Sequence, residues 1–151
     1  MERNTYRPCA ARVARMTTTV VLDTSALLAL AIEGPHRASM LAAVQQHETL
    51  VASAMALTEA LPAIDRLTDD DLVRNDLEDV VRLMWDHLHV VPLDARCLDT
   101  ASRLARERMM RLSDAIHFAA ADRLPRPAVF ATVDPAQIAV ALELGYEVWS
   151  T

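Results

Sequence analysis

The sequence contains no lysine, so all 15 of its basic side chains are arginines. P-loop nucleotidases and phosphate-accepting receiver domains normally need a lysine, and its absence excludes both classes. A haloacid-dehalogenase-like phosphatase is excluded as well, because it too uses a lysine and because Ser25 stands where the second acid of its D-x-D pair belongs. The missing lysine thus argues against three classes of protein that begin with a similar pattern of strands and helices.

Glycine and cysteine are also scarce. Gly34 and Gly145 are the only glycines in the sequence, so a glycine-rich dinucleotide-binding loop cannot form. Cys9 and Cys97 are too few for a disulfide framework or a metal knuckle, which makes a reducing cytosol the default environment. No apolar run reaches the roughly 18 to 20 residues needed to cross a bilayer. We therefore expect a soluble, cytoplasmic protein that makes no use of a membrane.

Length and composition favour one domain. A chain of 151 residues that is 52% hydrophobic suits a single core. Residues 1–16 are rich in arginine and lack apolar periodicity, so we expect a disordered basic arm, or a misassigned start that precedes the true one at Met16. Residues 17–151 then form the folded domain. The net charge of −6 argues against a generally basic surface that coats nucleic acid, but not against an enzyme with an acidic metal site.

Short apolar strands alternate with helices over most of the sequence. Strands are expected at residues 20–22, 49–52, 88–91, 129–131 and 147–149. Helices are expected at residues 24–32, 36–46, 53–67, 68–85, 94–109, 113–123 and 135–144. This alternation predicts an α/β three-layer fold with a mainly parallel sheet, whose ligand site lies beyond the carboxyl ends of the strands.

Local signals mark how two of these helices begin and continue. Thr24 or Ser25 can cap the first helix, and Ser53 can cap the third. Pro62 falls inside the third helix and should kink it. Such a kink would alter the aim of Glu59, which lies on the same helix.

Four carboxylates occupy unusual places. Asp23 ends the first strand and Asp134 follows the fourth, so both should project into the crevice at the sheet edge, although each could instead be a helix N-cap. Glu59 lies in a nearly apolar helix, where an unpaired carboxylate is costly and favours a metal or cation partner, unless a narrow solvent stripe exposes it. Asp114 lies in a first helical turn, where the helix dipole alone could explain it. Four acids at one edge would repel each other without divalent cations, and oxygen-only ligation favours magnesium or manganese.

Histidines and arginines near these acids each allow a structural and a functional interpretation. His117 lies three residues after Asp114 and could ligate metal, but its core-like neighbours favour a packed histidine. His87 and His89 are interpreted as structural or surface residues. Five arginines precede or flank the Asp114 helix and form either a solvated helix face or phosphate contacts: Arg96, Arg103, Arg106, Arg108 and Arg111. Arg111 is nearest the acids in sequence and is the best candidate to contact a phosphodiester.

Four motifs, in their order and spacing, resemble those of PIN-domain ribonucleases, and particularly VapC-type toxins. They are DTSAL at 23–27, LTE at 57–59, SDAIHFAAA at 113–121 and FATVDP at 130–135, with Leu144 and Gly145 behind the last. The resemblance covers about residues 19 to 149. It implies a PIN-like fold and a Mg²⁺- or Mn²⁺-dependent endoribonuclease, the toxin of a toxin–antitoxin system, held inactive by a cognate antitoxin and usually a homodimer.

The resemblance also assigns roles to residues of this sequence. The acids that match metal-binding and catalytic positions are Asp23, Glu59, Asp114 and Asp134. The hydroxyls that match supporting positions are Thr24 and Ser25, beside the first acid Asp23, and Thr132 in the last motif. Divalent ions held by such acids can clamp a phosphodiester and activate water, without lysine, nucleophilic cysteine or a covalent intermediate. The alternative is a PIN-like module that binds RNA or protein and is catalytically weak.

Overall fold

The computed structural model describes residues 18–47 and 49–150. In chain order the elements are β1 (Thr19–Leu22), α1 (Thr24–Ala31), α2 (Pro35–Gln45), β2 (Leu50–Ser53), α3 (Ala54–Asp65), α4 (Asp71–Trp85), β3 (His89–Val91), α5 (Ala95–Arg108), α6 (Leu112–Ala121), β4 (Ala128–Ala131), α7 (Pro135–Glu143) and β5 (Glu147–Trp149). The predicted alternation is confirmed, with boundaries within a few residues. The predicted basic arm and the alternative start at Met16 lie outside the described residues.

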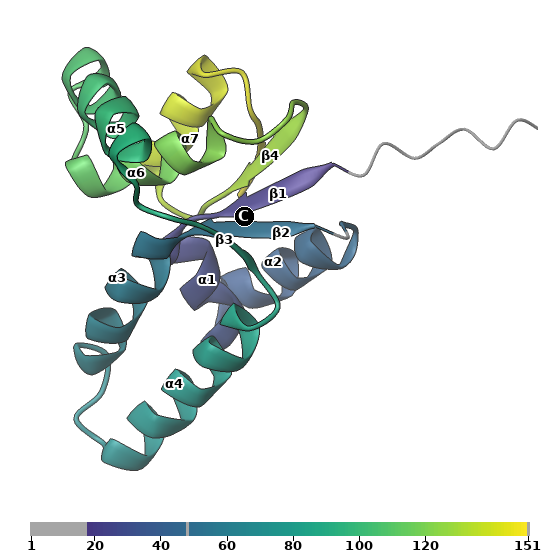
Figure 1. Ribbon diagram of the computed structural model, residues 1–151. Helices are drawn as coiled ribbons and strands as arrows, with labels where there is room; N and C mark the ends of the chain where they lie inside the picture. The colour runs from purple at the N-terminus through teal and green to yellow at the C-terminus, as the bar shows by residue number, and fades with distance from the viewer. Residues whose placement is uncertain (1–17, 48, 151) are drawn as a thin grey trace, which may run out of the picture.

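The described strands form one five-stranded sheet in the order β3-β2-β1-β4-β5, and every neighbouring pair is parallel (Figure 1). Leu22, at the end of β1, lies beside Ala52 of β2 and Ala131 of β4. The strand order runs outward in both directions from the β1 and β4 pair, and ligands of open parallel sheets bind at such a switch point. The carboxyl ends of β1 and β4 therefore meet where the sequence predicts a site.

Helices cover both faces of the sheet. Helices α5, α6 and α7 lie on one face, while α1 and α2 lie on the other (Figure 1). Alternate residues of β1 point to the two sides: Val21 joins the cluster around the stacked rings of Phe118 and Phe130, and Val20 joins the cluster around Met40. Burial on both faces explains why these strands read as continuous apolar runs.

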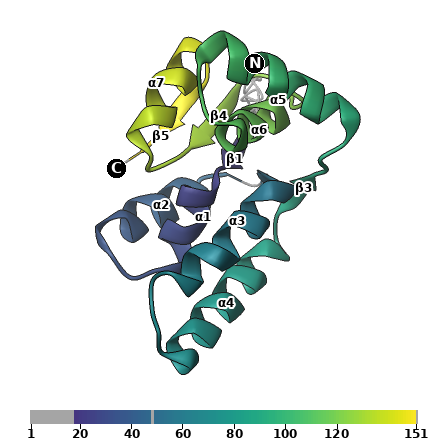
Figure 2. The ribbon, with the colours of Figure 1, turned by 90° about the vertical axis from the view of Figure 1, so that its left-hand side faces the viewer.

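Helices α3 and α4 extend away from the sheet as a pair (Figure 2). Their contact is built on Ala56, Ala60 and Ile64 of α3 and on Val81 of α4, all fully buried. Helix α3 continues past Pro62 to Asp65, so the proline does not end the helix, and the kink expected there stays a prediction. None of the helices in the described ranges is long and apolar enough to cross a membrane.

Candidate active site

Asp23 directly follows β1 and is the N-cap residue of α1. Its Oδ1 accepts a 2.8 Å hydrogen bond from the backbone N–H of Ala26. The expectation that Thr24 or Ser25 caps this helix is therefore wrong, because the capping carboxylate lies one residue earlier, where the chain still has extended geometry. The side chain of Asp23 is 0% exposed, so its remaining lone pairs must find partners inside the protein.

Two hydroxyls meet the buried Asp23 carboxylate. Ser25 Oγ donates to Oδ1 at 2.7 Å, and Thr132 Oγ1, at the end of β4, donates to Oδ2 at 2.6 Å. Burial raises the pKa of Asp23, while the hydrogen bonds from Thr132, Ala26 and Ser25 partly oppose that rise. Neutral hydroxyls thus hold this carboxylate without neutralising its charge.

Thr24 supports a different acid from the one expected. Its Oγ1 donates a 2.5 Å hydrogen bond to Oε2 of Glu59 on α3, and not to Asp23. Glu59 is 31% exposed at its side chain and is therefore neither on a fully solvated stripe nor isolated in the core. The hydrogen bond from His117 lowers the pKa of Glu59, and those from Thr24 and Ser113 add to this effect. The carboxylate is therefore held in its ionised form.

His117 is a packed histidine, as expected, but its ring joins the polar network. It is 2% exposed, and Nε2 lies 2.8 Å from Glu59 Oε2. A neutral ring that donates from Nε2 accepts at Nδ1, where the Ser53 hydroxyl lies 3.1 Å away. Ser53 occupies the N-cap position of α3 as predicted, yet its hydroxyl makes no capping bond, because it is directed to His117.

Asp114 lies in the first turn of α6, buried between two side chains. Arg111 contacts both of its oxygens, with Nε 2.9 Å from Oδ2 and Nη2 3.2 Å from Oδ1. Gln137 of α7 donates from Nε2 to Oδ1 at 3.0 Å. The helix dipole is therefore not the sole partner of this carboxylate.

Gln137 is a site residue that sequence reasoning missed. It lies three positions after Asp134, the spacing of a capping box in which the glutamine would return to the Asp134 backbone N–H. Instead that N–H donates to Thr132 Oγ1 at 3.0 Å, and the Gln137 amide crosses to Asp114. The capping-box spacing was the available signal, but it predicts a contact with the Asp134 backbone and not the observed contact with Asp114.

Asp134 caps α7 and also faces the site. Its Oδ1 accepts from the Ala136 N–H at 2.9 Å, while Arg111 Nη2 lies 3.3 Å from Oδ2. The N-cap alternative is therefore correct for both Asp23 and Asp134. In each case the capping bond engages Oδ1, while Oδ2 contacts Thr132 in Asp23 and Arg111 in Asp134.

The residues at this edge fit a divalent cation by their chemistry. Carboxylate and hydroxyl oxygens are the ligands that Mg²⁺ and Mn²⁺ prefer. The guanidinium of Arg111 lies between Asp114 and Asp134, so a single positive centre already contacts both carboxylates. Within residues 18–47 and 49–150, no group of three or more acidic, histidine or cysteine side chains is arranged to hold a metal ion as it stands. Metal binding therefore requires these side chains to adjust.

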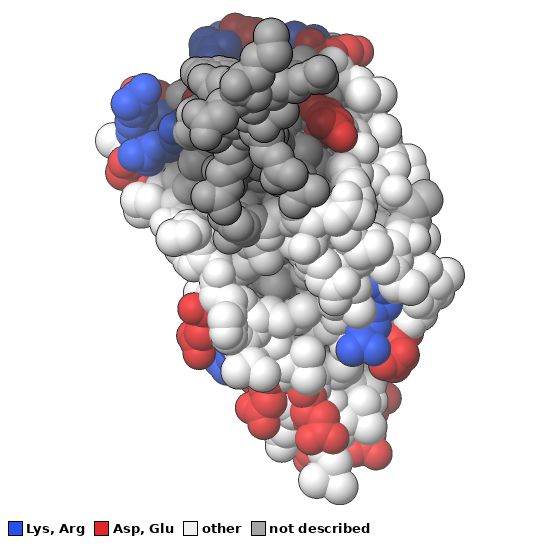
Figure 3. All heavy atoms as spheres, turned by 90° about the vertical axis from the view of Figure 1, so that its right-hand side faces the viewer, with Lys and Arg blue, Asp and Glu red and all other residues white. Residues whose placement is uncertain are grey.

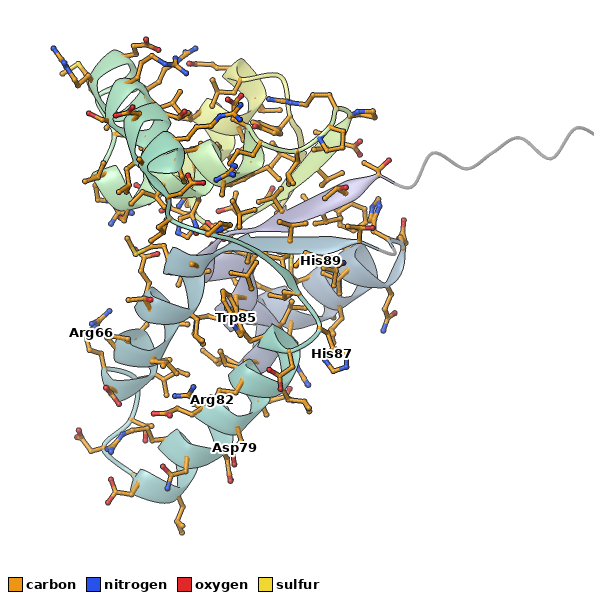
Figure 4. The ribbon with its side chains drawn as sticks, in the orientation of Figure 1. Arg66, Asp79, Arg82, Trp85, His87 and His89 are labelled. Atoms are coloured by element: carbon orange, nitrogen blue, oxygen red, sulfur yellow. The ribbon has the colours of Figure 1, made fainter. Side chains whose placement is uncertain are left out.

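Other residues with possible functions lie apart from the acids or pair locally. His87 and His89 are exposed and lie at the end of α4 and in β3 (Figure 4), in agreement with the surface interpretation. Arg103 pairs with Glu107 at 3.1 Å on α5, as the solvated-face interpretation predicts. Of the five arginines, Arg111 is the one that contacts the acids.

Comparisons with known proteins agree with this fold. A family model described as the PIN domain matches residues 20–145. A search of curated proteins finds no match. Among solved structures, FitAcB from Neisseria gonorrhoeae is 16% identical with a TM-score of 0.66, over 86% of this chain and 96% of that one.

Two further solved structures share the fold. DNA-bound VapBC from Salmonella typhimurium is 17% identical with a TM-score of 0.66, over 87% of this chain and 98% of that one. VapC20 from Mycobacterium tuberculosis, described as a toxin that cleaves the sarcin–ricin loop, is 16% identical with a TM-score of 0.64, over 80% and 94%. At these identities the likeness concerns the fold.

Proposed function

Because the chain belongs to the PIN-domain family, we propose that it is a divalent-metal-dependent endoribonuclease, the toxin of a toxin–antitoxin pair. One observation carries the proposal: four acids from four separate segments converge at the carboxyl edge of a parallel sheet, and three of them are joined through shared hydrogen-bond partners. Asp23 and Asp134 share Thr132, and Asp114 and Asp134 share Arg111. Helix capping alone would not require these four acids to converge at one edge of the sheet.

In this proposal Asp23, Asp114 and Asp134 bind Mg²⁺ or Mn²⁺, and Glu59 completes the cluster or orients the attacking water. When bound, the metal would supply a lowered pKa for that water and neutralise charge on the phosphodiester. Other residues of the chain hold the proposed metal ligands in position. Ser25 and Thr132 hold Asp23, while Gln137 holds Asp114.

Glu59 suits the task of accepting a hydrogen bond from water. Its lowered pKa keeps the carboxylate ionised, and Thr24 and His117 both anchor Oε2. Because two side chains from α1 and α6 fix one oxygen, the carboxylate has little freedom to rotate. A group so restrained can orient water without first reorganising.

Surface charge limits how RNA can approach. Acidic side chains gather at one end of the molecule, where α4 begins, in the lower part of Figure 3. Phosphates would be repelled there. Arg111 is 71% exposed beside the acids and presents a planar fork that suits a phosphate. We therefore expect RNA to lie across the α6 and α7 ends of the sheet edge.

The partner in this proposal is a cognate antitoxin, and the active form is a homodimer. One structure with the same fold is described as a toxin–antitoxin complex from Klebsiella pneumoniae, and another is VapBC2 from Rickettsia felis bound to a DNA fragment from their promoter. This supports an antitoxin for the present chain. The cellular location in the proposal is the cytoplasm, where the RNA and the antitoxin would be found.

The decisive experiment is RNA cleavage by purified protein free of antitoxin. We expect cleavage of cellular RNA with Mn²⁺ or Mg²⁺, none with EDTA, and none with Asp23→Asn. Asp94→Asn is the matched control, because Asp94 caps α5 through Cys97 and lies outside the site. It should cleave like the wild type. A wild-type protein that cleaves no RNA at any concentration would support the catalytically weak binding module instead.

A further inference from the structure

Arg111 lies between two of the acids that are proposed to bind the cation. Its Nη2 is 3.2 Å from Asp114 Oδ1 and 3.3 Å from Asp134 Oδ2, while its Nε is 2.9 Å from Asp114 Oδ2. A metal ion that bridges these two carboxylates would meet the guanidinium in the same space. The arginine and the metal are therefore alternatives at this position.

Resting on the proposed function, we propose that Arg111 is a positioning residue with two successive partners. In the metal-free protein it is the counter-ion that holds Asp114 and Asp134 together. A divalent cation displaces it, and the freed guanidinium then binds the phosphate of the RNA. The same side chain thus preserves the site and links metal binding to substrate binding.

The contacts of Arg111 suit a reversible role. The paired fork on Asp114 has the geometry of a specific interaction. The arginine side chain is nevertheless 71% exposed, and an exposed ion pair is weak because water and salt screen it. A divalent ion brings twice the charge to the same two carboxylates, so it can displace the guanidinium.

Asp114 and Asp134 each have a further contact that does not depend on Arg111. Gln137 still donates to Asp114, and the Ala136 N–H still fixes Asp134 as a helix cap. A hollow of about 270 Å³ borders Arg111, Met110 and Gln137, which gives the arginine side chain room to turn. Movement of the guanidinium would open the space between the two carboxylates, and the acids would then adjust around the cation.

This arrangement makes metal and phosphate binding cooperative. One guanidinium cannot bind both carboxylates and a phosphate at the same time. A metal ion that releases it from the carboxylates therefore makes it available to the phosphate. By linkage, phosphate binding strengthens metal binding by the same factor. A surface arginine with no contact to the acids would bind phosphate without this coupling.

Titration with Mn²⁺, followed by calorimetry, tests the competition without reference to cleavage. We expect Arg111→Ala to bind Mn²⁺ at least threefold more tightly than the wild type, and Arg111→Lys to fall between them. Arg103→Ala is the matched control, because Arg103 is exposed and pairs with Glu107. It should bind like the wild type. Equal or weaker binding by Arg111→Ala would overturn the competition.

Binding of a short phosphorothioate RNA that resists cleavage tests the coupling. Mn²⁺ should strengthen its binding to the wild type beyond the strengthening seen with Arg111→Ala. Equal strengthening in the two proteins would overturn the coupling. If the wild type cleaves RNA and Arg111→Ala binds Mn²⁺ with unchanged affinity, the inference about Arg111 is wrong and the proposed nuclease function stands. If the wild type does not cleave RNA but Arg111→Ala binds Mn²⁺ more tightly, the proposed nuclease function is wrong and the competition between Arg111 and the metal stands.

Discussion

Thr132 donates a 2.6 Å hydrogen bond to Oδ2 of Asp23, across 109 positions of the sequence. Thr132 Oγ1 also accepts a hydrogen bond from the Asp134 backbone N–H at 3.0 Å. A hydroxyl has one hydrogen to donate and lone pairs to accept, and Thr132 uses both capacities. One side chain directly after β4 therefore connects Asp23 with Asp134, the first and the last of the four candidate acids.

Thr132→Val should reduce the free energy of unfolding by about 2 to 3 kcal/mol. The substitution keeps the shape but leaves a fully buried carboxylate and a backbone N–H each short of a partner, and hydrogen bonds to charged groups are worth roughly 1.5 to 3 kcal/mol. Urea unfolding measures the change. Thr68→Val is the control, because Thr68 accepts from the Asp70 N–H at an exposed loop. A Thr132→Val protein as stable as the wild type would contradict the assigned role of this bond.

Asp23→Asn should change how stability depends on pH. Burial raises the pKa of Asp23 above its ordinary 3.8, so the folded protein holds the proton more tightly than the unfolded chain. The stability contribution is therefore full below about the ordinary pKa, and it is lost as pH rises through the raised one. Asparagine caps helices as well as aspartate does, so the variant removes the titration and keeps the cap.

Urea unfolding of both proteins from acid to neutral pH, without metal, checks this expectation. The stability of the wild type relative to Asp23→Asn should decline as pH rises. Added Mn²⁺ should then restore stability to the wild type and not to the variant. A difference between the two proteins that is constant over the whole range would show that Asp23 does not carry a raised pKa.

The sequence predicted the elements of the fold better than it predicted the hydrogen-bond partners of the four acids. Strand β1 and helix α1 follow from local pattern, because apolar runs and capping residues act over a few positions. Thr24 was expected beside Asp23 but bonds Glu59, which is 35 residues away. Gln137 and Asp114 meet across 23 residues for the same reason: their contact depends on how α6 and α7 pack, and no local pattern encodes it.

Glu59→Gln should show the opposite pH dependence from Asp23→Asn. The hydrogen bond from His117 lowers the pKa of Glu59 below its ordinary 4.5, so its stabilisation is present above that value and is lost as pH falls through the lowered one. We expect a loss of roughly 1 kcal/mol or less at neutral pH, because solvent screens this partly exposed group. Unfolding at neutral and acid pH measures it, with Glu107→Gln as an exposed control. A larger loss at acid pH than at neutral pH would contradict the assignment.

Asp134 caps a helix and also faces the site, and two substitutions separate these roles. Asp134→Asn keeps an oxygen for the Ala136 N–H and removes the charge, whereas Asp134→Ala removes both. The alanine variant should lose about 1 kcal/mol of stability, the usual value of an N-cap, and the asparagine variant should lose less.

Both variants should bind Mn²⁺ more weakly by roughly tenfold or more, which corresponds to about 1.4 kcal/mol of lost binding free energy. Calorimetric titration measures the affinity. Asp94→Asn and Asp94→Ala repeat the same pair of changes at the cap of α5, and they should leave Mn²⁺ affinity unchanged. Unchanged affinity in both Asp134 variants would assign this residue to capping alone. Weaker binding in the asparagine variant, whose cap is intact, would establish that the charge of Asp134 acts on the metal directly.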